Sequence, residues 1–222
     1  MTYLRFADAD IDEQAALIFK MCREFGPLYD YFARLRAMDL PDAWIVSGAI
    51  YNNVWNYLTE RPPMHGVKDV DIFYHDAGAT TYDDEDKIIN DAEAVFAGMQ
   101  VPVEVRNQAR VHLWYPAHFG FEYPKLDHSR EAIDRFACTT HSVGMRLNNK
   151  DQFELYAPFG LREIFAFNLV PNYNLPNKET HLNKGERLCA LWPELKMEPW
   201  ADEMPAHLVP QPDMSLQFVE RH

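Results

Sequence analysis

This sequence of 222 residues has only three cysteines, and no two of them form a CxxC pair. Cys22, Cys138 and Cys189 therefore indicate neither a disulfide framework nor a zinc knuckle, and we interpret them as reduced structural thiols. No apolar run approaches the roughly 20 residues that span a bilayer. The acidic start MTYLRFADADIDEQ also lacks the hydrophobic segment of a signal peptide. We expect a cytoplasmic protein without a membrane partner.

Basic residues are scarce as well, with 21 Lys and Arg against 34 Asp and Glu, for a formal net charge of −13. A protein that grips long nucleic acid through its phosphates needs the opposite sign. An acidic chain can still bind a nucleotide when a divalent cation neutralises the phosphates locally. We therefore expect small-molecule partners rather than long nucleic acid.

Several common catalytic motifs are missing. The absence of GxxxxGK[ST], GxGxxG and GxSxG argues against P-loop, Rossmann and α/β-hydrolase proteins. The histidines show neither HxxxH nor HExxH spacing, which argues against a zinc site. Glycine is sparse, with 9 residues against 15 prolines, while 47% hydrophobic residues suffice for a substantial core. These proportions indicate a well-ordered globular chain.

Hydrophobic spacing predicts an α+β protein that alternates helices and strands along the first half of the chain. We expect one domain over residues 1–222, with a helical part at 1–40, a core at about 40–110 and an α+β extension at 111–222. The predicted helices cover 11–24, 28–40, 49–58, 83–99, 129–137 (capped by Ser129), 160–170 and 186–195, with another beginning within 107–115; the predicted strands cover 43–48, 69–74 and 101–106, and 143–156 forms a hairpin.

Two aspartates stand one residue apart in the predicted strand of GVKDVDIFYHD. Because side chains alternate along a strand, Asp69 and Asp71 face the same way, about 6.5–7 Å apart. Glu104, in VPVEVR, faces away from its apolar neighbours in the same manner. Three carboxylates on one surface repel one another unless a cation lies between them, and oxygen ligands suit Mg²⁺ or Mn²⁺.

A strand that runs into a tight turn and then a helix is predicted at WIVSGAI. The first N–H groups of such a helix bind anions, and Gly48 allows a phosphate to approach the backbone closely. Ser47 either caps the helix or donates to an oxygen of that phosphate. Each piece also has an ordinary structural explanation: a solvated strand end, a helix cap or a surface residue on an edge strand. The order of the pieces favours a functional site.

That order resembles the nucleotidyltransferase superfamily typified by DNA polymerase β. The shared pattern is a Gly turn that opens a helix, an Asp-hydrophobic-Asp strand and a third carboxylate on a later strand, matched here by SGA, DVD and Glu104. More narrowly, GAIYNNVWNYL, KDVDIFYHD and EVRNQARVHLWY look like a small bacterial nucleotidyltransferase family of uncharacterised acceptor. The resemblance implies a polymerase β-like core, a mixed sheet flanked by helices.

The resemblance implies a role for each matching residue. Asp69 and Asp71 would bind the metal ions, Glu104 would complete the site, and Ser47 with Gly48 would hold the triphosphate. Glu104 would lie nearest the incoming hydroxyl, to bind the ion that activates it or to accept its proton.

The sequence also departs from the superfamily pattern. Ala49 stands where the motif prefers Ser or Gly, and a Pro-rich loop lengthens the gap between turn and strand. Lys68, Arg106 and Arg110 are nearby cations that either contact phosphates or pair with local carboxylates.

The block NQARVHLW follows Glu104 directly. Asn107 and Gln108 either orient that carboxylate or read a ligand. If the segment is helical, Asn107, Arg110 and Trp114 share one face that borders the pocket. Ordinary helix packing explains Trp114 equally well.

Three hypotheses remain open at this stage. The first is a Mg²⁺-dependent (or Mn²⁺-dependent) nucleotidyltransferase that moves a nucleoside monophosphate from an NTP to a small-molecule or protein hydroxyl and releases pyrophosphate. The second is a catalytically silent nucleotide-binding protein of the same fold, suggested by Ala49. The third is a metal-dependent phosphohydrolase that uses the same acidic cluster. The acceptor, the preferred base and the oligomeric state do not follow from the sequence.

Overall fold

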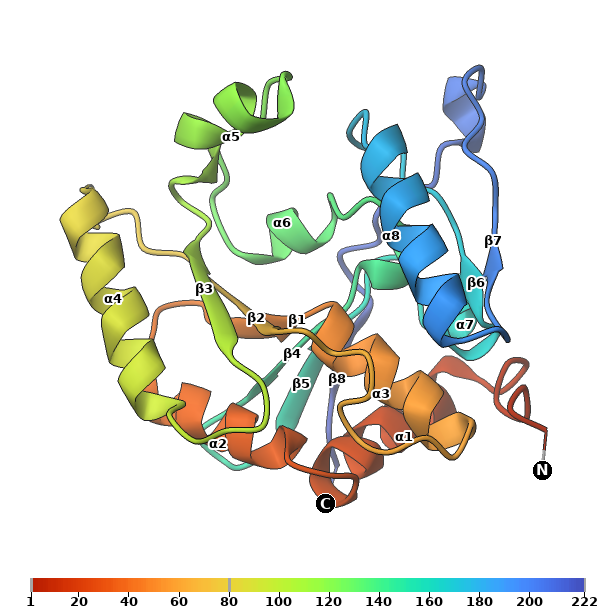
Figure 1. Ribbon diagram of the computed structural model, residues 1–222, viewed down its shortest axis with the longest axis horizontal. Coiled ribbons are helices and arrows are strands. Elements are labelled where there is room, and N and C mark those ends of the chain that lie inside the picture. The colour runs from red at the N-terminus through yellow and green to blue at the C-terminus, as the bar shows by residue number, and fades with distance from the viewer. Residues whose placement is uncertain (1, 80, 222) are drawn as a thin grey trace.

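The computed structural model describes residues 2–79 and 81–221. Within these residues the centre of the molecule is a six-stranded sheet in the order β3-β2-β1-β4-β5-β8, and a small two-stranded sheet pairs β6 with β7 (Figure 1). The strands are β1 Trp44–Val46, β2 Val70–Tyr74, β3 Val103–Asn107, β4 Gly144–Leu147, β5 Phe153–Tyr156, β6 Asn168–Leu169, β7 Lys196–Met197 and β8 Gln217–Val219.

The large sheet is mixed, as the sequence predicted. β2 and β3 run parallel, while the other neighbouring strands pair antiparallel. Parallel neighbours need a crossover, which the chain makes through helix α4 between β2 and β3. The strands β4, β5 and β8 come from residues after 110, so the C-terminal part is built into the same sheet as the strands that carry the aspartates.

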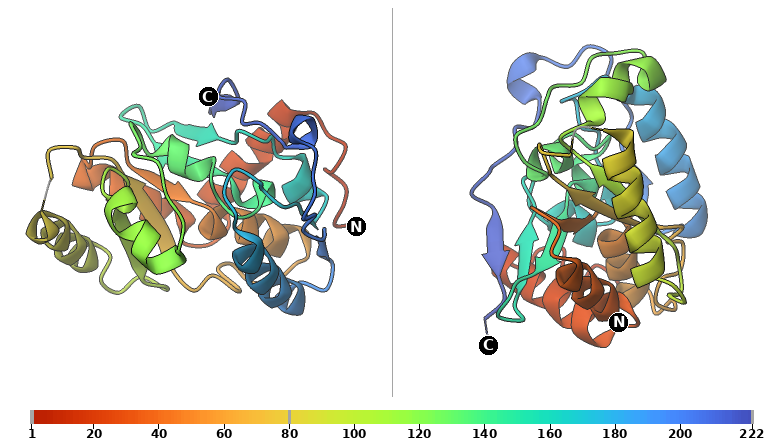
Figure 2. Two further views of the ribbon diagram at one scale, coloured as in Figure 1. Left: turned by 90° about the horizontal axis from the view of Figure 1, so that it is seen from above. Right: turned by 90° about the vertical axis from the view of Figure 1, so that its left-hand side faces the viewer.

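Helices cover the two faces of the sheet unequally. Figures 1 and 2 show α1, α2 and α3 along one face, α4 beside the β3 edge, and α5, α6 and α8 above the other face. The main core packs the first three helices against apolar strand residues such as Ile45, Ile72 and Leu155. The helices are α1 Ile11–Glu24, α2 Leu28–Met38, α3 Gly48–Leu58, α4 Tyr82–Val95, α5 Val111–Phe119, α6 Arg130–Ile133, α7 Arg162–Phe165 and α8 Lys178–Leu191.

Local sequence explains where these helices begin. Asp10 caps α1, since its Oδ1 accepts a hydrogen bond from the Glu13 N–H at 2.8 Å. α4 opens with a capping box in which Thr81 and Asp84 satisfy each other's backbone N–H groups. α3 is buried on nearly every side, so its stability comes from packing rather than from an amphipathic pattern.

Four predicted elements differ in the structure. The predicted helix at 129–137 shrinks to α6, and Ser129 does not cap it because its N–H and Oγ both bond to Asp42. The predicted helix at 160–170 shrinks to α7, because Phe167 takes a left-handed conformation and the chain continues into β6. The helix expected within 107–115 begins at Val111, since Asn107 still belongs to β3. The helix predicted at 186–195 is α8, which starts already at Lys178.

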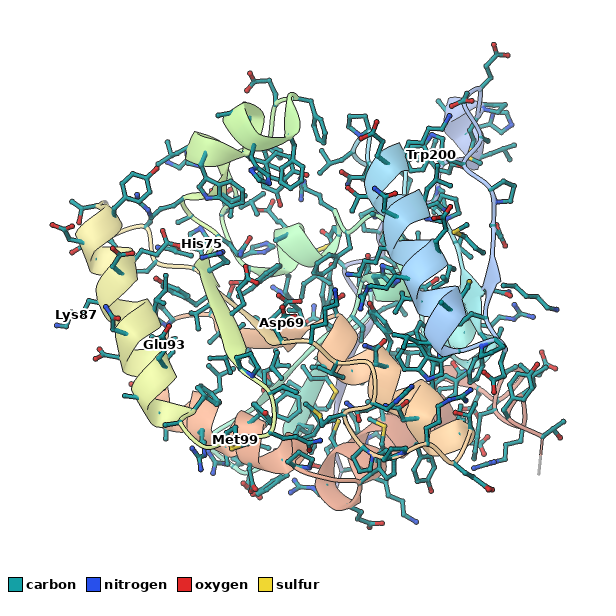
Figure 3. All side chains as sticks on the ribbon, in the orientation of Figure 1. Asp69, His75, Lys87, Glu93, Met99 and Trp200 are labelled. Carbon is teal, nitrogen blue, oxygen red and sulfur yellow. The ribbon has the colours of Figure 1, made fainter. Side chains whose placement is uncertain are left out.

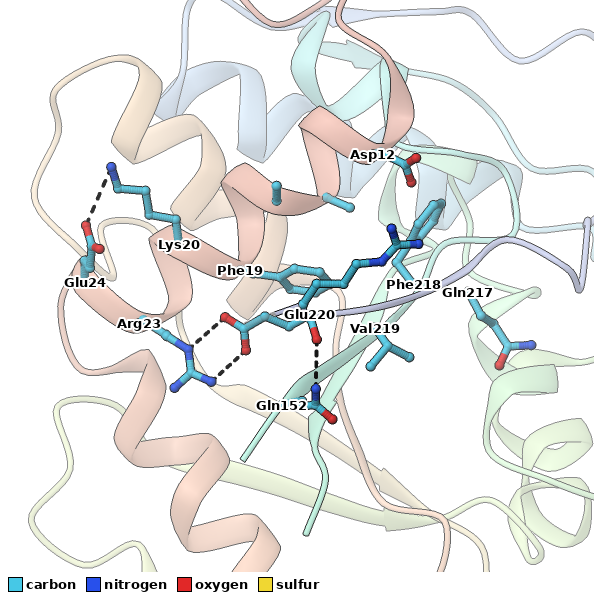
Figure 4. Close-up of a pocket in the computed structure, with 13 residues that line it drawn as sticks. Asp12, Phe19, Lys20, Arg23, Glu24, Gln152, Gln217, Phe218, Val219 and Glu220 are labelled. Atoms are coloured by element: carbon cyan, nitrogen blue, oxygen red, sulfur yellow. Dashed lines mark hydrogen bonds and ion pairs between the residues drawn. The ribbon is translucent and has the colours of Figure 1, made fainter. Parts of the chain in front are cut away.

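The C-terminal strand is fastened to the first helix by charge. Arg23 of α1 donates to both carboxylate oxygens of Glu220 at 2.8 and 2.6 Å (Figure 4). Arg23 also pairs with Asp151. The adjacent cavity of about 820 Å³ lies between α1 and β8. Its main charged groups are thus engaged with each other, so we assign it a structural role. No helix in the described part of the chain is long and apolar enough to cross a membrane.

Candidate active site

Asp71 and Glu104 lie side by side on the face of the sheet that α1, α2 and α3 do not cover. The parallel pairing places Asp71 opposite Glu104 and Phe73 opposite Arg106. Val70 and Ile72 alternate with them and are buried in the core. The two carboxylates therefore point away from the hydrophobic interior, as the alternation of the sequence predicted.

Asp69 stands one residue before β2 rather than within it. It lines the same cavity as Asp71, and Figure 3 shows it near the centre of the molecule, between β3 and α8. Burial raises the pKa of Asp71 to about 6, and the negative charges of Asp69 and Glu104 add to this, while Lys184 and Arg106 oppose it. Asp69 and Glu104 are thus both close enough to Asp71 to interact with it electrostatically.

The three carboxylates do not form a ready-made metal cage. Among residues 2–79 and 81–221, no group of three His, Cys, Asp or Glu side chains is arranged so that it could hold a metal ion. Glu104 pairs instead with Arg106 at 2.9 Å, and both side chains are nearly half exposed. The donor set still suits a hard divalent cation, because it consists of carboxylate oxygens. The raised pKa of Asp71 also means that a cation nearby would stabilise its ionised form.

A cavity of about 390 Å³, here called the cationic pocket, opens on one side of Asp71. It gathers three cations in a chain whose formal net charge is −13. Such a local excess of positive charge favours a polyanion. The lining residues come from α3, the loop before β2, and α8: Gly48, Tyr51, Asn52, Gly66, Val67, Lys68, Asp69, Asp71, Asn183, Lys184 and Arg187.

Polar atoms at the start of α3 are poorly satisfied. Of the buried side-chain atoms in the described structure, Ser47 Oγ, Tyr51 OH and Asn52 Oδ1 make no hydrogen bond of good geometry, although Tyr51 OH lies close enough to Ser47 and Lys184 to interact with both. Leaving such a group unsatisfied costs about 1–3 kcal/mol. Tyr51 and Asn52 line the cationic pocket, and a Cβ at Gly48 would lie 3.6 Å from Asn52 Nδ2 and 3.8 Å from Tyr51 OH. The fold itself thus tolerates a side chain at Gly48, so neither its backbone conformation nor its packing requires glycine.

Ser47 occupies a strained turn. Its φ of 57° and ψ of −116° lie in a region that favours glycine, and its side chain does not cap α3. The capping alternative for Ser47 is therefore wrong. Its backbone N–H bonds to Val143 O at 2.8 Å and its carbonyl accepts from Ile50 and Tyr51. These bonds hold the strand-to-helix turn.

Lys184 and Arg187 were missed by the sequence analysis, because the predicted helix at 186–195 began after Lys184 and nothing in the sequence linked Arg187 to the aspartates. Lys184 lies near Asp71 and Tyr51, whose negative forms raise its pKa despite burial. The two cations stand three residues apart on α8, a spacing that places them on one helix face. Recognising Asn177 after Pro176 as a helix start was the available signal.

Asparagines of α3 position both the loop and α8 around the pocket. The Met64 N–H donates to Asn53 Oδ1 at 2.8 Å, and Asn56 Nδ2 donates to His65 O at 3.0 Å. Trp192, just after α8, donates from Nε1 to Asn56 Oδ1 at 3.1 Å. One buried helix thus fixes the loop that carries Lys68 and the helix that carries Lys184.

A second cavity, here called the aromatic pocket, has a volume of about 270 Å³ and lies on the Glu104 side of Asp71. Asp71 lines both pockets and so stands where they meet. The lining is rich in rings: Asp71, Phe73, Glu104, Arg106, Gln108, Val111, Trp114, Tyr115, Phe119, Tyr123, Ala132, Arg135, Phe136, Ala137, Asn177 and Thr180.

The three cations expected at the site have different positions. Lys68 lines the cationic pocket, and Arg106 lines the aromatic pocket beside Glu104. Arg110 lines neither of these two pockets. Its Nε donates to Glu85 Oε2 at 3.1 Å, and its guanidinium lies 4.8 Å from the centre of the Tyr82 ring. Arg110 therefore pairs with a local carboxylate, the structural alternative for this residue.

The NQAR segment is mostly a structural clamp. Asn107 Oδ1 accepts from the Asp76 N–H at 3.1 Å and its Nδ2 donates to Asp76 O at 2.9 Å, so it ties the ends of β2 and β3 together. Gln108 and Trp114 reach the aromatic pocket. The expectation that Asn107 shares a helical face with Trp114 is wrong, because Asn107 ends a strand.

Comparison with known proteins identifies the family. Residues 33–197 match the model of a family described as Nucleotidyltransferase. A structure determined by NMR and described as revealing a CCA-adding enzyme head domain superposes with a TM-score of 0.67 at 22% identity, over 87% of this chain and 100% of that one. No curated protein matches the sequence significantly. The chain belongs to the nucleotidyltransferase family, and its fold is polymerase β-like.

Proposed function

We propose that the protein is a metal-dependent nucleotidyltransferase, which moves a nucleoside monophosphate from an NTP to a hydroxyl of a small molecule or protein and releases pyrophosphate. The observation that carries this proposal is the cationic pocket, in which three cations and two poorly satisfied polar side chains surround a cavity that opens onto Asp71. Membership of the nucleotidyltransferase family supports the same conclusion.

The cationic pocket is the binding site for the triphosphate in this proposal. Lys184 and Arg187 offset the negative charge that grows on the leaving pyrophosphate, and Lys68 contributes from the loop. Gly48 lets a phosphate oxygen approach the start of α3, where Tyr51 OH donates to it and the helix dipole favours an anion. Ser47 is fully buried and does not line the pocket, but it precedes Gly48 directly and its Oγ makes no hydrogen bond of good geometry, so we include it among the phosphate-binding groups.

Asp69, Asp71 and Glu104 are the residues that would hold Mg²⁺ or Mn²⁺. When bound, the cation supplies charge neutralisation at the phosphates and lowers the pKa of the attacking hydroxyl. Asp71 lines both pockets, and Asp69 lines the cationic pocket beside it. Glu104 must exchange its Arg106 partner for this role, which its exposure permits.

The atoms of the reaction balance without any other reactant. The acceptor oxygen forms a bond to the α-phosphorus, and the bond between the α- and β-phosphates breaks with its electron pair leaving on pyrophosphate. The hydroxyl proton passes to Glu104 or to solvent. Attacking and leaving oxygens lie roughly in line in such displacements.

One observation favours a second candidate, a catalytically silent nucleotide-binding protein. Glu104, the carboxylate proposed to serve the acceptor, is tied to Arg106 at 2.9 Å. If that ion pair persists with nucleotide bound, the protein binds NTP without transfer.

The decisive experiment measures pyrophosphate release from each of the four NTPs with Mg²⁺ or Mn²⁺, in wild type and in Asp69→Asn and Asp71→Asn. We expect metal-dependent release that falls at least about 1,000-fold in Asp71→Asn, because that carboxylate faces both pockets. NTP binding by calorimetry without release would support the silent alternative, and orthophosphate as product would indicate a phosphohydrolase. Absence of both metal and NTP binding would refute the proposal.

A further inference from the structure

The two pockets share a single lining residue, Asp71, and this arrangement suggests a direction for the reaction. If the β- and γ-phosphates occupy the cationic pocket, as the proposed function requires, the α-phosphorus lies at Asp71. An in-line displacement then brings the attacking oxygen from the side opposite the leaving pyrophosphate. The aromatic pocket lies on that side and contains Glu104.

We propose that the aromatic pocket binds the acceptor, and that the acceptor is a small molecule or a peptide side chain whose flat aromatic ring carries the attacking hydroxyl. This inference rests on the proposed function. It adds the chemical class of the second substrate, which neither the family nor the fold specifies.

The walls of the pocket are largely aromatic. Phe73 and Phe136 stack on each other with their ring centres 5.7 Å apart and an angle of 22° between their planes. Tyr115 belongs to a second group of rings, since its ring centre lies 4.4 Å from that of Tyr123 and 4.3 Å from that of Phe119. Aromatic pairs prefer such offset or tilted contacts, each worth about 0.5–1.5 kcal/mol beyond the area buried. A flat ring that enters the pocket can make contacts of the same kind with these walls.

The size of the pocket limits the acceptor. Its volume of about 270 Å³ is below the range of about 300–1,000 Å³ that is typical of drug-sized ligands. One ring with a short substituent fits this space, whereas a folded nucleic acid does not. An exposed phenol or a tyrosine side chain at the end of a flexible peptide meets the requirement.

The charged residues of the aromatic pocket favour one kind of phenol over another as the acceptor. Glu104 and Arg106 pair with each other, and Asp71 faces the proposed metal. Arg135 also lines the pocket and has no ion pair within the described residues. A carboxylate on the ring substituent would meet this guanidinium, so we expect acidic phenols to be better acceptors than neutral ones.

The first test compares acceptors that differ only in the ring. Transfer from α-labelled NTP is measured to 4-hydroxyphenylacetate and to its saturated analogue, 4-hydroxycyclohexylacetate, with N-acetyltyrosinamide and adenosine as further arms. We expect labelled product with 4-hydroxyphenylacetate at a KM at least about threefold below that of the saturated analogue, since the two rings bury similar areas and an aromatic contact contributes about 0.5–1.5 kcal/mol beyond that area. Product with tyrosinamide alone would identify a peptide acceptor. Equal use of both ring types would overturn the proposal.

The second test uses variants of α5, a helix whose residues lie mostly outside the main core. Trp114→Ala and Phe119→Ala remove two walls of the pocket, and Leu113→Ala is the matched control, because Leu113 is 60% exposed on the same helix and does not line the pocket. We expect the KM for the acceptor to rise about tenfold in the first two variants while NTP affinity stays within twofold. A parallel loss of NTP affinity would mean that the pocket holds the nucleobase, and would overturn the proposal.

A third measurement separates failure of this inference from failure of the proposed function. Binding of 4-hydroxyphenylacetate is followed by tryptophan fluorescence in the presence of Mg²⁺ and a non-hydrolysable NTP, in wild type and in Trp114→Phe. We expect saturable quenching that Trp114→Phe removes. Quenching without any pyrophosphate release would support the pocket assignment and refute transferase activity. Release that occurs without quenching by any ring compound would refute the assignment alone.

Discussion

The cationic and aromatic pockets share Asp71 but differ in almost every other respect. The first is lined by three cations and by poorly satisfied polar atoms, and its residues come from a deeply buried helix and the segments hydrogen-bonded to it. The second is lined by rings that already contact one another, and several of them come from α5 and the loop that follows it. A site built for an anion keeps its donors free, whereas a site built for a ring keeps its surfaces apolar.

The two pockets also differ in how firmly the core fixes them, in line with the two substrates that we assign to them. A triphosphate is common to all nucleotidyl transfer, so its site is fixed by α3 and its asparagines. The acceptor differs between enzymes, and its pocket is formed by a shorter helix and by loops, which change shape and sequence at lower cost to the core. The next three predictions test this division, from the largest expected effect to the smallest.

Replacing Lys184 tests the assignment of the cationic pocket. Lys184→Met keeps the length of the side chain and removes the charge next to Asp71. Because a charge-assisted hydrogen bond contributes about 1.5–3 kcal/mol, we expect the dissociation constant for Mg²⁺–NTP to rise about 10- to 100-fold in calorimetry. Acceptor binding should be unaffected.

The matched control for Lys184→Met is Lys178→Met on the same helix. Lys178 is exposed and pairs with Asp202 at 2.6 Å, and it does not line the cationic pocket. We expect NTP affinity within twofold of wild type. Equal losses in the two variants would show that general charge, rather than this pocket, attracts the nucleotide.

Asp71→Asn tests the charge at the meeting point of the pockets through stability. In the folded protein burial raises the pKa of Asp71 to about 6, whereas an unfolded Asp titrates near 3.8. The folded state therefore holds this proton more tightly, and stability falls as the pH rises from about 4 to about 6 and then levels off. The difference of about two pH units between these two pKa values corresponds to about 3 kcal/mol in the free energy of unfolding. Partial exposure of Asp71 to solvent reduces this to about 2 kcal/mol.

The measurement is urea unfolding of wild type and Asp71→Asn between pH 4 and pH 8 with a chelator present. We expect Asp71→Asn to be more stable than wild type by about 2 kcal/mol at pH 8 and by little at pH 4. Since metal binding relieves the same repulsion, added Mg²⁺ should narrow the difference. A difference that does not change with pH would mean that Asp71 is an ordinary surface carboxylate.

The local patterns of the sequence anticipated the acidic half of the site. Alternation around Asp71 and Glu104 predicted their common face, and the parallel register bears this out. The cations of α8 were not anticipated, because the predicted helix began only at residue 186 and the sequence does not show that α8 packs beside Asp71. In the structure a Cβ at Gly185 would meet the side chain of Met197, which would have to move, so glycine suits the packing of α8 against β7. Contacts of this kind link distant segments and leave no local signal.

The aromatic pocket illustrates the same limit. Each ring, taken alone, was consistent with ordinary packing, and only the return of the chain through α6 and α8 places Phe136 and Asn177 opposite Trp114. Arg110 is a further case, because the sequence left open whether it contacts phosphate or pairs with a carboxylate, and only the fold shows the pair. Its partner Glu85 lies on α4, beyond the reach of any local pattern.

The smallest expected effect concerns the strained turn beneath the cationic pocket. Ser47→Gly relieves a left-handed backbone conformation that costs of order 1–3 kcal/mol in a non-glycine residue, and the added freedom of the unfolded chain offsets part of this. We expect a net gain of about 1 kcal/mol in urea unfolding. If the Ser47 hydroxyl binds phosphate as proposed, NTP affinity should fall about threefold to tenfold at the same time, the worth of one neutral hydrogen bond.

Ser47→Ala separates these two consequences, because it removes the hydroxyl and keeps the strain. It should reproduce the loss of NTP affinity without the backbone relief. Should both variants bind Mg²⁺–NTP as tightly as wild type, Ser47 would have no part in phosphate binding, and its unpartnered hydroxyl would be a consequence of the turn alone. The strain would then serve only to direct the start of α3, with Gly48 and Tyr51, at the pocket above it.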